Sequence, residues 1–202
     1  MIFNYFKIAW RNFSKDRLYS TINLLGFTIG LTVCLLIVLY VSDELSYDRF
    51  HTHSDRIYRL EMDRVEGAST ARSLYMPTLL GGELQRQFPE IEAHTILNSR
   101  GSLTIGEEKI SIKGFLANTQ SLDVFTFPLI YGDKETALDE PDEIIISEKI
   151  ANQFFPDQNP VGQSLTSSIQ SKDGSYKEFK VGGVMKDMPK QSHFHADAIR
   201  FV

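Results

Sequence analysis

Residues 22–41, INLLGFTIGLTVCLLIVLYV, form a stretch of twenty residues without a charge. An α-helix of this length reaches about 30 Å, which is the thickness of a bilayer's hydrocarbon core. Thirteen of its residues are Leu, Ile, Val or Phe, and at roughly −0.3 to −0.6 kcal/mol each they favour insertion by about −4 to −8 kcal/mol. A buried core helix is the alternative, but such helices usually keep a polar face. We therefore predict a membrane span.

The charges on either side of this stretch orient it. Residues 1–21 carry Lys7, Arg11, Lys15 and Arg17 against Asp16 alone, a net charge of +3. Because the whole chain carries −5, the remaining residues carry −8. The positive-inside rule then puts the N-terminus in the cytoplasm and residues from about 43 onward outside the plasma (inner) membrane. The acidic balance of that outer part argues against nucleic-acid binding.

A cleaved signal peptide is the alternative to an uncleaved anchor. The leader and the apolar core are both longer than is typical of signal peptides, and no small-x-small cleavage site precedes VSDELSYD. The sequence therefore favours the anchor.

The leader, MIFNYFKIAWRNF, is amphipathic. Its apolar positions at helical spacing are Ile2, Phe6, Ala9, Trp10 and Phe13, whereas Lys7 and Arg11 fall on the opposite side. This pattern predicts a helix lying in the inner membrane interface, with Trp10 at headgroup level and Lys7 and Arg11 directed toward lipid phosphates. A leader that only fixes the topology is the other interpretation.

Gly26 and Gly30 form a Gly-x-x-x-Gly pair inside the apolar stretch. In lipid, helices associate by close backbone packing, so a bare face of this kind invites a partner helix. Glycine is also common in membrane helices for other reasons, and both interpretations stay open. The pair is a candidate helix-packing site.

The fold class expected is a membrane-anchored α+β protein, with a leader helix at 1–20, a transmembrane helix and the start of a stalk at 21–46, and a mixed α/β extracytoplasmic domain at 47–202. The bend into the span is expected at 14–21, and the helix is expected to continue through 42–50. Periodicity predicts helices over 77–88, 118–125 and 148–155, the last with Ser147 as its N-cap, and strands over 58–65, 91–97, 103–105, 110–116, 143–146, 163–169, 176–184 and 199–202. The first of these strands is expected to be half-buried, with Tyr58 and Leu60 on one side. Hairpin turns are expected at 106–108 and 172–174.

Few residues suggest chemistry. The chain holds no Gly-x-x-x-x-Gly-Lys-Ser/Thr loop, and Cys34 is its one cysteine. Two His-x-His pairs, His51/His53 and His193/His195, could offer four nitrogens to zinc. Both pairs lie in expected loops, so exposed or hydrogen-bonded loop histidines are the favoured interpretation. The sequence assigns no catalytic residue, cofactor or metal.

Several blocks of the chain resemble, in order, the N-terminal part of MacB/FtsX-type ABC transporter permeases that carry a MacB-like periplasmic core domain. These blocks are IAWRN at 8–12, YSTINLLGFTIGL at 19–31, DELSYDRFH at 43–51, RIYR at 56–59, ISEKIANQFF at 146–155, NPVGQ at 159–163 and VGGVMKDMPKQSH at 181–193. Each block is loose, but the ordered series is specific and covers essentially the whole chain.

The resemblance implies a permease subunit without catalysis. Such permeases pair with a separate cytoplasmic ATPase and typically work as dimers, for efflux, for export or to transmit force to periplasmic partners. It also implies that the chain is the N-terminal part of a longer polypeptide with three further spans. Two other classes remain: a single-pass anchored sensor or adhesion domain, and an anchored metal hydrolase that uses the histidine pairs.

Overall fold

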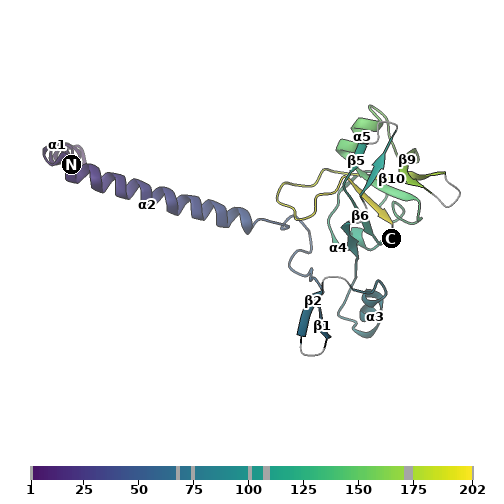
Figure 1. The fold of residues 1–202 in the computed structure, drawn as a ribbon. Helices are drawn as coiled ribbons and strands as arrows, with labels where there is room; N and C mark the ends of the chain where they lie inside the picture. The colour runs from purple at the N-terminus through teal and green to yellow at the C-terminus, as the bar shows by residue number, and fades with distance from the viewer. Residues whose placement is uncertain are drawn as a thin grey trace. The chain divides into compact units, whose positions relative to one another are not determined.

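The computed structural model describes residues 2–66, 69–73, 76–99, 102–106, 110–170 and 175–201. The chain divides into two compact units, Met1–Tyr47 and Asp48–Val202. The first unit is helical, and the second is a mixed α/β domain (Figure 1).

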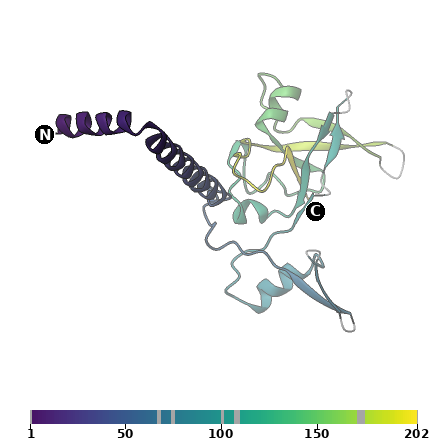
Figure 2. The same cartoon turned by 60° about the vertical axis from the view of Figure 1, so that its left-hand side comes forward.

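The first unit holds two helices, α1 (Ile2–Lys15) and α2 (Arg17–Glu44). They are separated at Asp16, whose backbone leaves the helical region at φ −115° and ψ 62°. The bend expected at 14–21 is therefore confined to one residue, since the polar residues that follow Asp16 include no helix breaker. Figure 2 shows α2 as one continuous helix.

The helix α2 is long and apolar enough to cross a membrane. Two of its threonines bond back to the helix: Thr28 donates to the carbonyl of Leu24 at 2.7 Å, and Thr32 donates to that of Thr28 at 2.8 Å. Satisfying polar groups within the helix is what a lipid-exposed segment requires.

The expected continuation of the helix through residue 50 is wrong. The helix ends at Glu44, and tighter bonds replace the helical ones, from Ser46 N–H to the Asp43 carbonyl at 3.0 Å and from Tyr47 N–H to the Glu44 carbonyl at 3.4 Å. The Ser46 hydroxyl also donates to the Asp43 carbonyl, at 2.6 Å. Serine side chains compete in this way for the carbonyls that would continue a helix.

The second unit is built on a mixed sheet. In the described part of the chain its strands run in the order β3-β6-β11-β8-β10-β9-β4-β5, with β7 also paired to β10. The strands are β3 (Leu97–Asn98), β4 (Leu103–Ile105), β5 (Ile110–Ile112), β6 (Gly114–Ala117), β7 (Leu129–Gly132), β8 (Glu143–Ser147), β9 (Ser164–Gln170), β10 (Tyr176–Met185) and β11 (Ala198–Phe201). The pairs β8–β10 and β6–β11 are parallel, and the other pairs are antiparallel.

Both faces of this sheet are covered, and β8 shows why. All five of its residues are buried, which is the pattern of a central strand between two layers. Ile144 and Ile146 face one core together with Ile150 of α5 (Glu148–Phe154), whereas Ile145 faces a second core with Leu122 of α4 (Ser121–Val124). The predicted N-cap of α5 is confirmed, because the Ser147 hydroxyl accepts from Ile150 N–H at 3.4 Å.

Two glycines let a loop lie directly on the sheet. A Cβ on Gly182 in β10 would stand 2.3 Å from the carbonyl oxygen of Ala137, and a Cβ on Gly183 would stand 3.3 Å from the Ala137 side chain. Ala137 and Leu138 are fully buried at this contact. The Gly-Gly pair in VGGVM is therefore a packing requirement of residues 133–138.

The structure corrects the expected elements between residues 57 and 98. The strand expected at 58–65 is displaced to β1 (Met62–Glu66), which pairs with an unforeseen partner, β2 (Ser69–Ser73). Tyr58 and Leu60, expected to face a core, are 82% and 48% exposed. The strand expected at 91–97 shrinks to β3, and the helix expected at 77–88 is α3 (Leu80–Gln87).

The expected hairpin strands elsewhere are confirmed. β4 pairs antiparallel with β5, and β9 pairs antiparallel with β10. The turn expected at 106–108 is described only at Gly106, and the turn expected at 172–174 lies outside the described residues. The strand expected at 110–116 is two strands, β5 and β6, and β7 was not expected.

Candidate functional site

The second unit begins with residues 48–56, a run of turns that we call the docking segment. It lies on two loops of the same unit, loop 125–127 and loop 191–194. Its first residue, Asp48, has a left-handed backbone with φ 56°. Aspartate adopts this conformation more readily than most residues, because its short side chain can bond locally.

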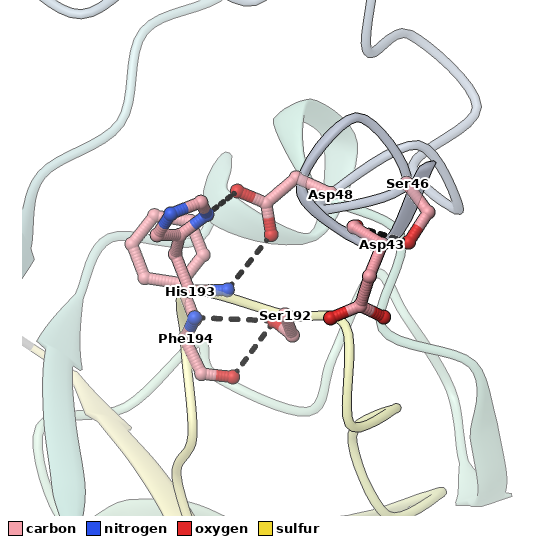
Figure 3. A network of polar contacts seen from close by, with 6 residues as sticks. All are labelled: Asp43, Ser46, Asp48, Ser192, His193 and Phe194. Atoms are coloured by element: carbon pink, nitrogen blue, oxygen red, sulfur yellow. Dashed lines mark hydrogen bonds and ion pairs between the residues drawn. The ribbon is translucent and has the colours of Figure 1, made fainter. Parts of the chain in front are cut away.

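Asp48 holds loop 191–194 through three contacts, and Figure 3 shows the two that involve His193. Its N–H donates to the Gln191 carbonyl at 2.9 Å. Its carboxylate accepts from the His193 backbone N–H at 2.9 Å, and its other oxygen lies 2.7 Å from Nδ1 of the same histidine. Hydrogen bonds to a charged carboxylate are roughly twice as strong as neutral ones.

The loop that receives Asp48 is itself fixed by Ser192. The Ser192 hydroxyl accepts from Phe194 N–H at 3.1 Å and donates to the Phe194 carbonyl at 2.9 Å (Figure 3). Ser192 is 2% exposed. The His193 backbone is therefore held in place between two fixed neighbours.

The docking segment is held at two points, which we call its anchors. The first is Asp48 on loop 191–194, and the second is His51 on loop 125–127. Its ring is 3% exposed, and its Nδ1 lies 3.1 Å from the backbone N–H of Thr126. The rings of Phe50, Phe125 and Phe127 lie around it, with centroids at 4.0, 5.1 and 6.1 Å. Burial lowers the pKa of His51 below its ordinary value, and the Asp48 carboxylate opposes this effect in part.

Thr52 and Thr126 extend the second anchor. Thr52 N–H donates to the Thr126 hydroxyl at 2.8 Å, and the two hydroxyl oxygens lie 3.1 Å apart. Loop 125–127 thus meets the docking segment through its backbone and through a side chain. The two segments are far apart in sequence, so this contact must be made by tertiary folding.

The two receiving loops lead directly into the sheet. Loop 125–127 precedes β7, and loop 191–194 precedes β11, which lies between β6 and β8 near the middle of the sheet. A displacement of the docking segment would therefore be passed to a central strand through a few residues.

The far end of the docking segment is also tied down. Arg56 forms an ion pair with Glu92 at 2.8 Å, and it lies 3.0 Å from Nδ1 of His53. Arg56 and Glu92 flank residues 57–91, the stretch of chain that contains β1, β2 and α3. The pair is exposed, so it fixes geometry more than it adds stability.

A groove of about 460 Å³ borders the docking segment. Thr52 and His53 line it together with residues of loop 125–127, and so do Asp123 and Lys134, which form an ion pair at 2.6 Å. It opens to solvent beside the second anchor.

The structure gives the histidine pairs separate roles. His51 bonds Thr126, His53 bonds Arg56, His193 bonds Asp48, and His195 is exposed. Among the described residues, no three His, Cys, Asp or Glu side chains gather as a metal site would require. Three of these histidines are hydrogen-bonded and the fourth is exposed, as the favoured interpretation of the sequence expected.

The sequence did not identify the role of Asp48 or of Thr126. Both are ordinary surface residue types, and neither stands in a recognisable motif of chemistry. The available signal was indirect, since the blocks DELSYDRFH and VGGVMKDMPKQSH hold the two ends of the Asp48–His193 contact. No local pattern indicates that these blocks meet.

The candidate residues of the first unit all lie on exposed helix surface. A Cβ on Gly26 or Gly30 in α2 would meet nothing within 4 Å. Trp10 in α1 is 67% exposed, and Lys7 and Arg11 are exposed as well. Helix packing at the glycines and interfacial binding by α1 remain predictions.

The geometry can be set beside known proteins. The family described as MacB-like periplasmic core domain matches residues 20–202. A domain of a protein from Porphyromonas gingivalis described as a permease is similar with a TM-score of 0.55 and 26% identity, over 69% of this chain and 59% of that one. The present chain therefore spans about 59% of the length of that domain.

Two further structures are related more distantly. The extracellular domain of the noncanonic ABC-type transporter YknZ from Gram-positive bacteria matches with a TM-score of 0.37 and 21% identity, over 52% of this chain and 51% of that one. The periplasmic region of MacB from Actinobacillus actinomycetemcomitans matches with a TM-score of 0.31 and 17% identity, over 52% and 44%. The comparison with curated proteins found no match.

Proposed function

Because this chain belongs to the family of MacB-like periplasmic core domains, we propose that it is part of the permease subunit of an ABC transporter and works without catalysis of its own. The observation that carries the proposal is the joint presence of a span-length apolar helix and a docking segment that leads into the sheet. The general class of function, a transporter permease, is inferred from the family to which the chain belongs.

In this proposal α2 crosses the inner membrane once, with the N-terminus in the cytoplasm and the second unit outside. The unequal charge of the two ends supports this orientation. The helix α1 lies in the inner interface through Trp10, with Lys7 and Arg11 toward lipid phosphates. Gly26 and Gly30 pack against a neighbouring membrane helix, from a second copy or a paired permease.

The energy comes from a separate cytoplasmic ATPase. Its closure moves the permease helices, and the motion of α2 passes through the covalent link at residues 45–47 to the docking segment. Asp48 and His51 then pass it to loop 191–194 and loop 125–127, and so to β11 and β7. The outcome is efflux, export or transmission of force to a partner outside the membrane.

Distance measurements test this coupling. Spin labels at Ser46→Cys and Lys113→Cys, in a Cys34→Ala background, report the distance between the end of α2 and the sheet. The experiment uses the full permease with its ATPase in nanodiscs, free of nucleotide and trapped with ADP and vanadate. We expect a shifted distance distribution on trapping, and an unchanged distribution would contradict the coupling.

The alternative is a single-pass anchored sensor or adhesion domain. The gene sequence beyond the codon for Val202 separates the two. A continuing frame with three more apolar segments supports the permease, whereas an immediate stop codon would overturn it.

A further inference from the structure

We propose that His51 is a positioning residue that holds the docking segment on loop 125–127 only as a neutral imidazole, so that acid on the outer side of the membrane releases the segment. This inference rests on the proposed function for its biological meaning, because only an extracytoplasmic domain experiences the outside pH directly. The contact itself is a property of the second unit alone.

The hydrogen bond at His51 fixes which nitrogen carries the proton. A backbone N–H can only donate, so Nδ1 must accept from Thr126 N–H, at 3.1 Å, with its lone pair. The ring proton of the neutral form therefore lies on Nε2. Protonation adds a hydrogen to Nδ1, and two donors then face each other where one hydrogen bond had been.

The surroundings of the ring oppose the charge as well. His51 is 3% exposed, and its Nε2 is buried without a hydrogen-bond partner among the described residues. Three aromatic rings pack on it, those of Phe50, Phe125 and Phe127. An imidazolium in this cage has lost its water and has gained no acceptor for either nitrogen.

The groups that face the ring decide the sign of the pH effect. From its own segment the Asp48 carboxylate favours the charged form, and loop 125–127 contributes only neutral groups, namely two phenyl rings and Thr126. Burial outweighs Asp48, so the pKa of His51 falls below its ordinary value of 6.5. When the segment is undocked, the His51 ring is protonated at its ordinary pKa. When the segment is docked, protonation of the ring requires a lower pH. Docking is therefore fully stable above about pH 6.5 and weakens as the pH falls toward the lowered pKa.

Acid would release one anchor and spare the other. The contact of Asp48 with His193 joins the segment to a different loop, through a carboxylate and two N–H donors, and it does not involve the His51 ring. The segment would thus stay tethered at residue 48 while residues 51 and 52 leave loop 125–127. The coupling to β7 is lost first, and the coupling to β11 persists.

The test uses the whole chain in lipid nanodiscs without an ATPase, with ¹⁵N-labelled histidine and threonine. Long-range ¹H–¹⁵N spectra between pH 5 and 8 report the tautomer and the pKa of each imidazole, assigned with single His→Asn variants. Amide exchange at Thr52 and Thr126, divided by the intrinsic rate at each pH, reports whether the segment is docked.

We expect the Nε2–H tautomer at pH 7.5, a His51 pKa below 6.5, and a loss of protection at Thr126 of at least about tenfold on acidification. His51→Asn should keep its protection at low pH, because the asparagine Oδ1 takes the place of Nδ1 as an acceptor and does not titrate. His53→Asn, whose ring meets Arg56 at the exposed surface, should keep the wild-type pH dependence.

A His51 pKa at or above 6.5, an Nδ1–H tautomer, or protection at Thr126 that does not change with pH would overturn the inference. The wild-type titration alone decides these points if His51→Asn fails to fold. Because no ATPase is present, a failure here leaves the permease role standing, and a wrong topology would leave the measured contact intact.

Discussion

At the scale of single residues, the contact that matters most combines backbone conformation with charge. Asp48 occupies the left-handed region at φ 56° and bonds His193 through both carboxylate oxygens. A side chain that lacks either property would hold the docking segment less well. The two contributions can be separated because glycine keeps the conformation and loses the carboxylate, whereas alanine loses both.

The variants Asp48→Gly and Asp48→Ala test these contributions. We expect Asp48→Gly to lower the free energy of unfolding of the second unit by about 1–2 kcal/mol, because one carboxylate and its bonds are lost at a partly exposed site. Asp48→Ala should cost about 1 kcal/mol more, since a Cβ is strained at positive φ. Calorimetry of the chain in nanodiscs measures both.

Asp55→Ala is the matched control, because Asp55 is an exposed carboxylate in the same segment. It should stay within about 0.5 kcal/mol of wild type. Equal effects of Asp48→Ala and Asp55→Ala would contradict the role given to Asp48.

At the scale of elements, local sequence patterns correctly predicted the helices and strands whose formation depends mainly on neighbouring residues. The strand β8, the N-cap of α5 and the pairing of β9 with β10 follow from a buried apolar run, a serine before a helix and two alternating stretches around a turn. The missed strand β7 has Ile130 and Tyr131 exposed, at 42% and 45%, and is defined by its pairing with β10 rather than by its own pattern.

The wrongly predicted strand at 58–65 and the unpredicted contacts of the docking segment have the same cause, because both depend on contacts between residues far apart in the sequence. Tyr58 and Leu60 alternate with charges as a half-buried strand would, yet no described sheet receives them and they stay exposed. The docking segment likewise meets loop 125–127 at a separation of about 75 residues, which no local pattern encodes. Sequence periodicity could find the helices and core strands, but not the long-range contacts that make the site.

The variant Gly182→Ala tests the close approach of residues 133–138 to β10. A Cβ there would stand 2.3 Å from a backbone carbonyl oxygen, so the loop must shift. We expect a loss of about 1–3 kcal/mol in the stability of the second unit by calorimetry. Gly82→Ala in α3, whose nearest neighbour atom would lie at 3.8 Å, should be neutral or stabilising by up to about 1 kcal/mol. A harmless Gly182→Ala would contradict the packing argument.

The variant Gly30→Leu tests whether α2 packs through its glycine face. Cys34 lies one turn from Gly30 on the same face, so oxidation to a Cys34–Cys34 disulfide between two chains reports packing there. We expect Gly30→Leu to reduce this crosslink several-fold, because the added side chain separates the backbones. Thr32→Leu adds bulk about 200° around the helix and should leave crosslinking unchanged. Equal crosslinking in all three proteins would mean that Gly26 and Gly30 are ordinary membrane composition.

At the scale of the whole molecule, a span-length helix follows a basic leader of net charge +3, and the rest of the chain carries a net charge of −8. The family supports the permease class, and in the proposed mechanism the docking segment is the route from the end of that helix into the sheet. Every functional step we propose depends on the second unit lying outside the membrane that α2 crosses. Without this topology neither the coupling nor the response to outside acid has a physical basis.

Cysteine labelling on intact spheroplasts tests this topology most directly. In a Cys34→Ala background, single cysteines are placed at the exposed positions Asp139→Cys in the second unit and Lys15→Cys in the first, and a membrane-impermeant maleimide is added from outside. We predict that Asp139→Cys reacts at once and that Lys15→Cys reacts only after the membrane is permeabilised. Labelling of Lys15→Cys from outside, or protection of Asp139→Cys until permeabilisation, would contradict the account.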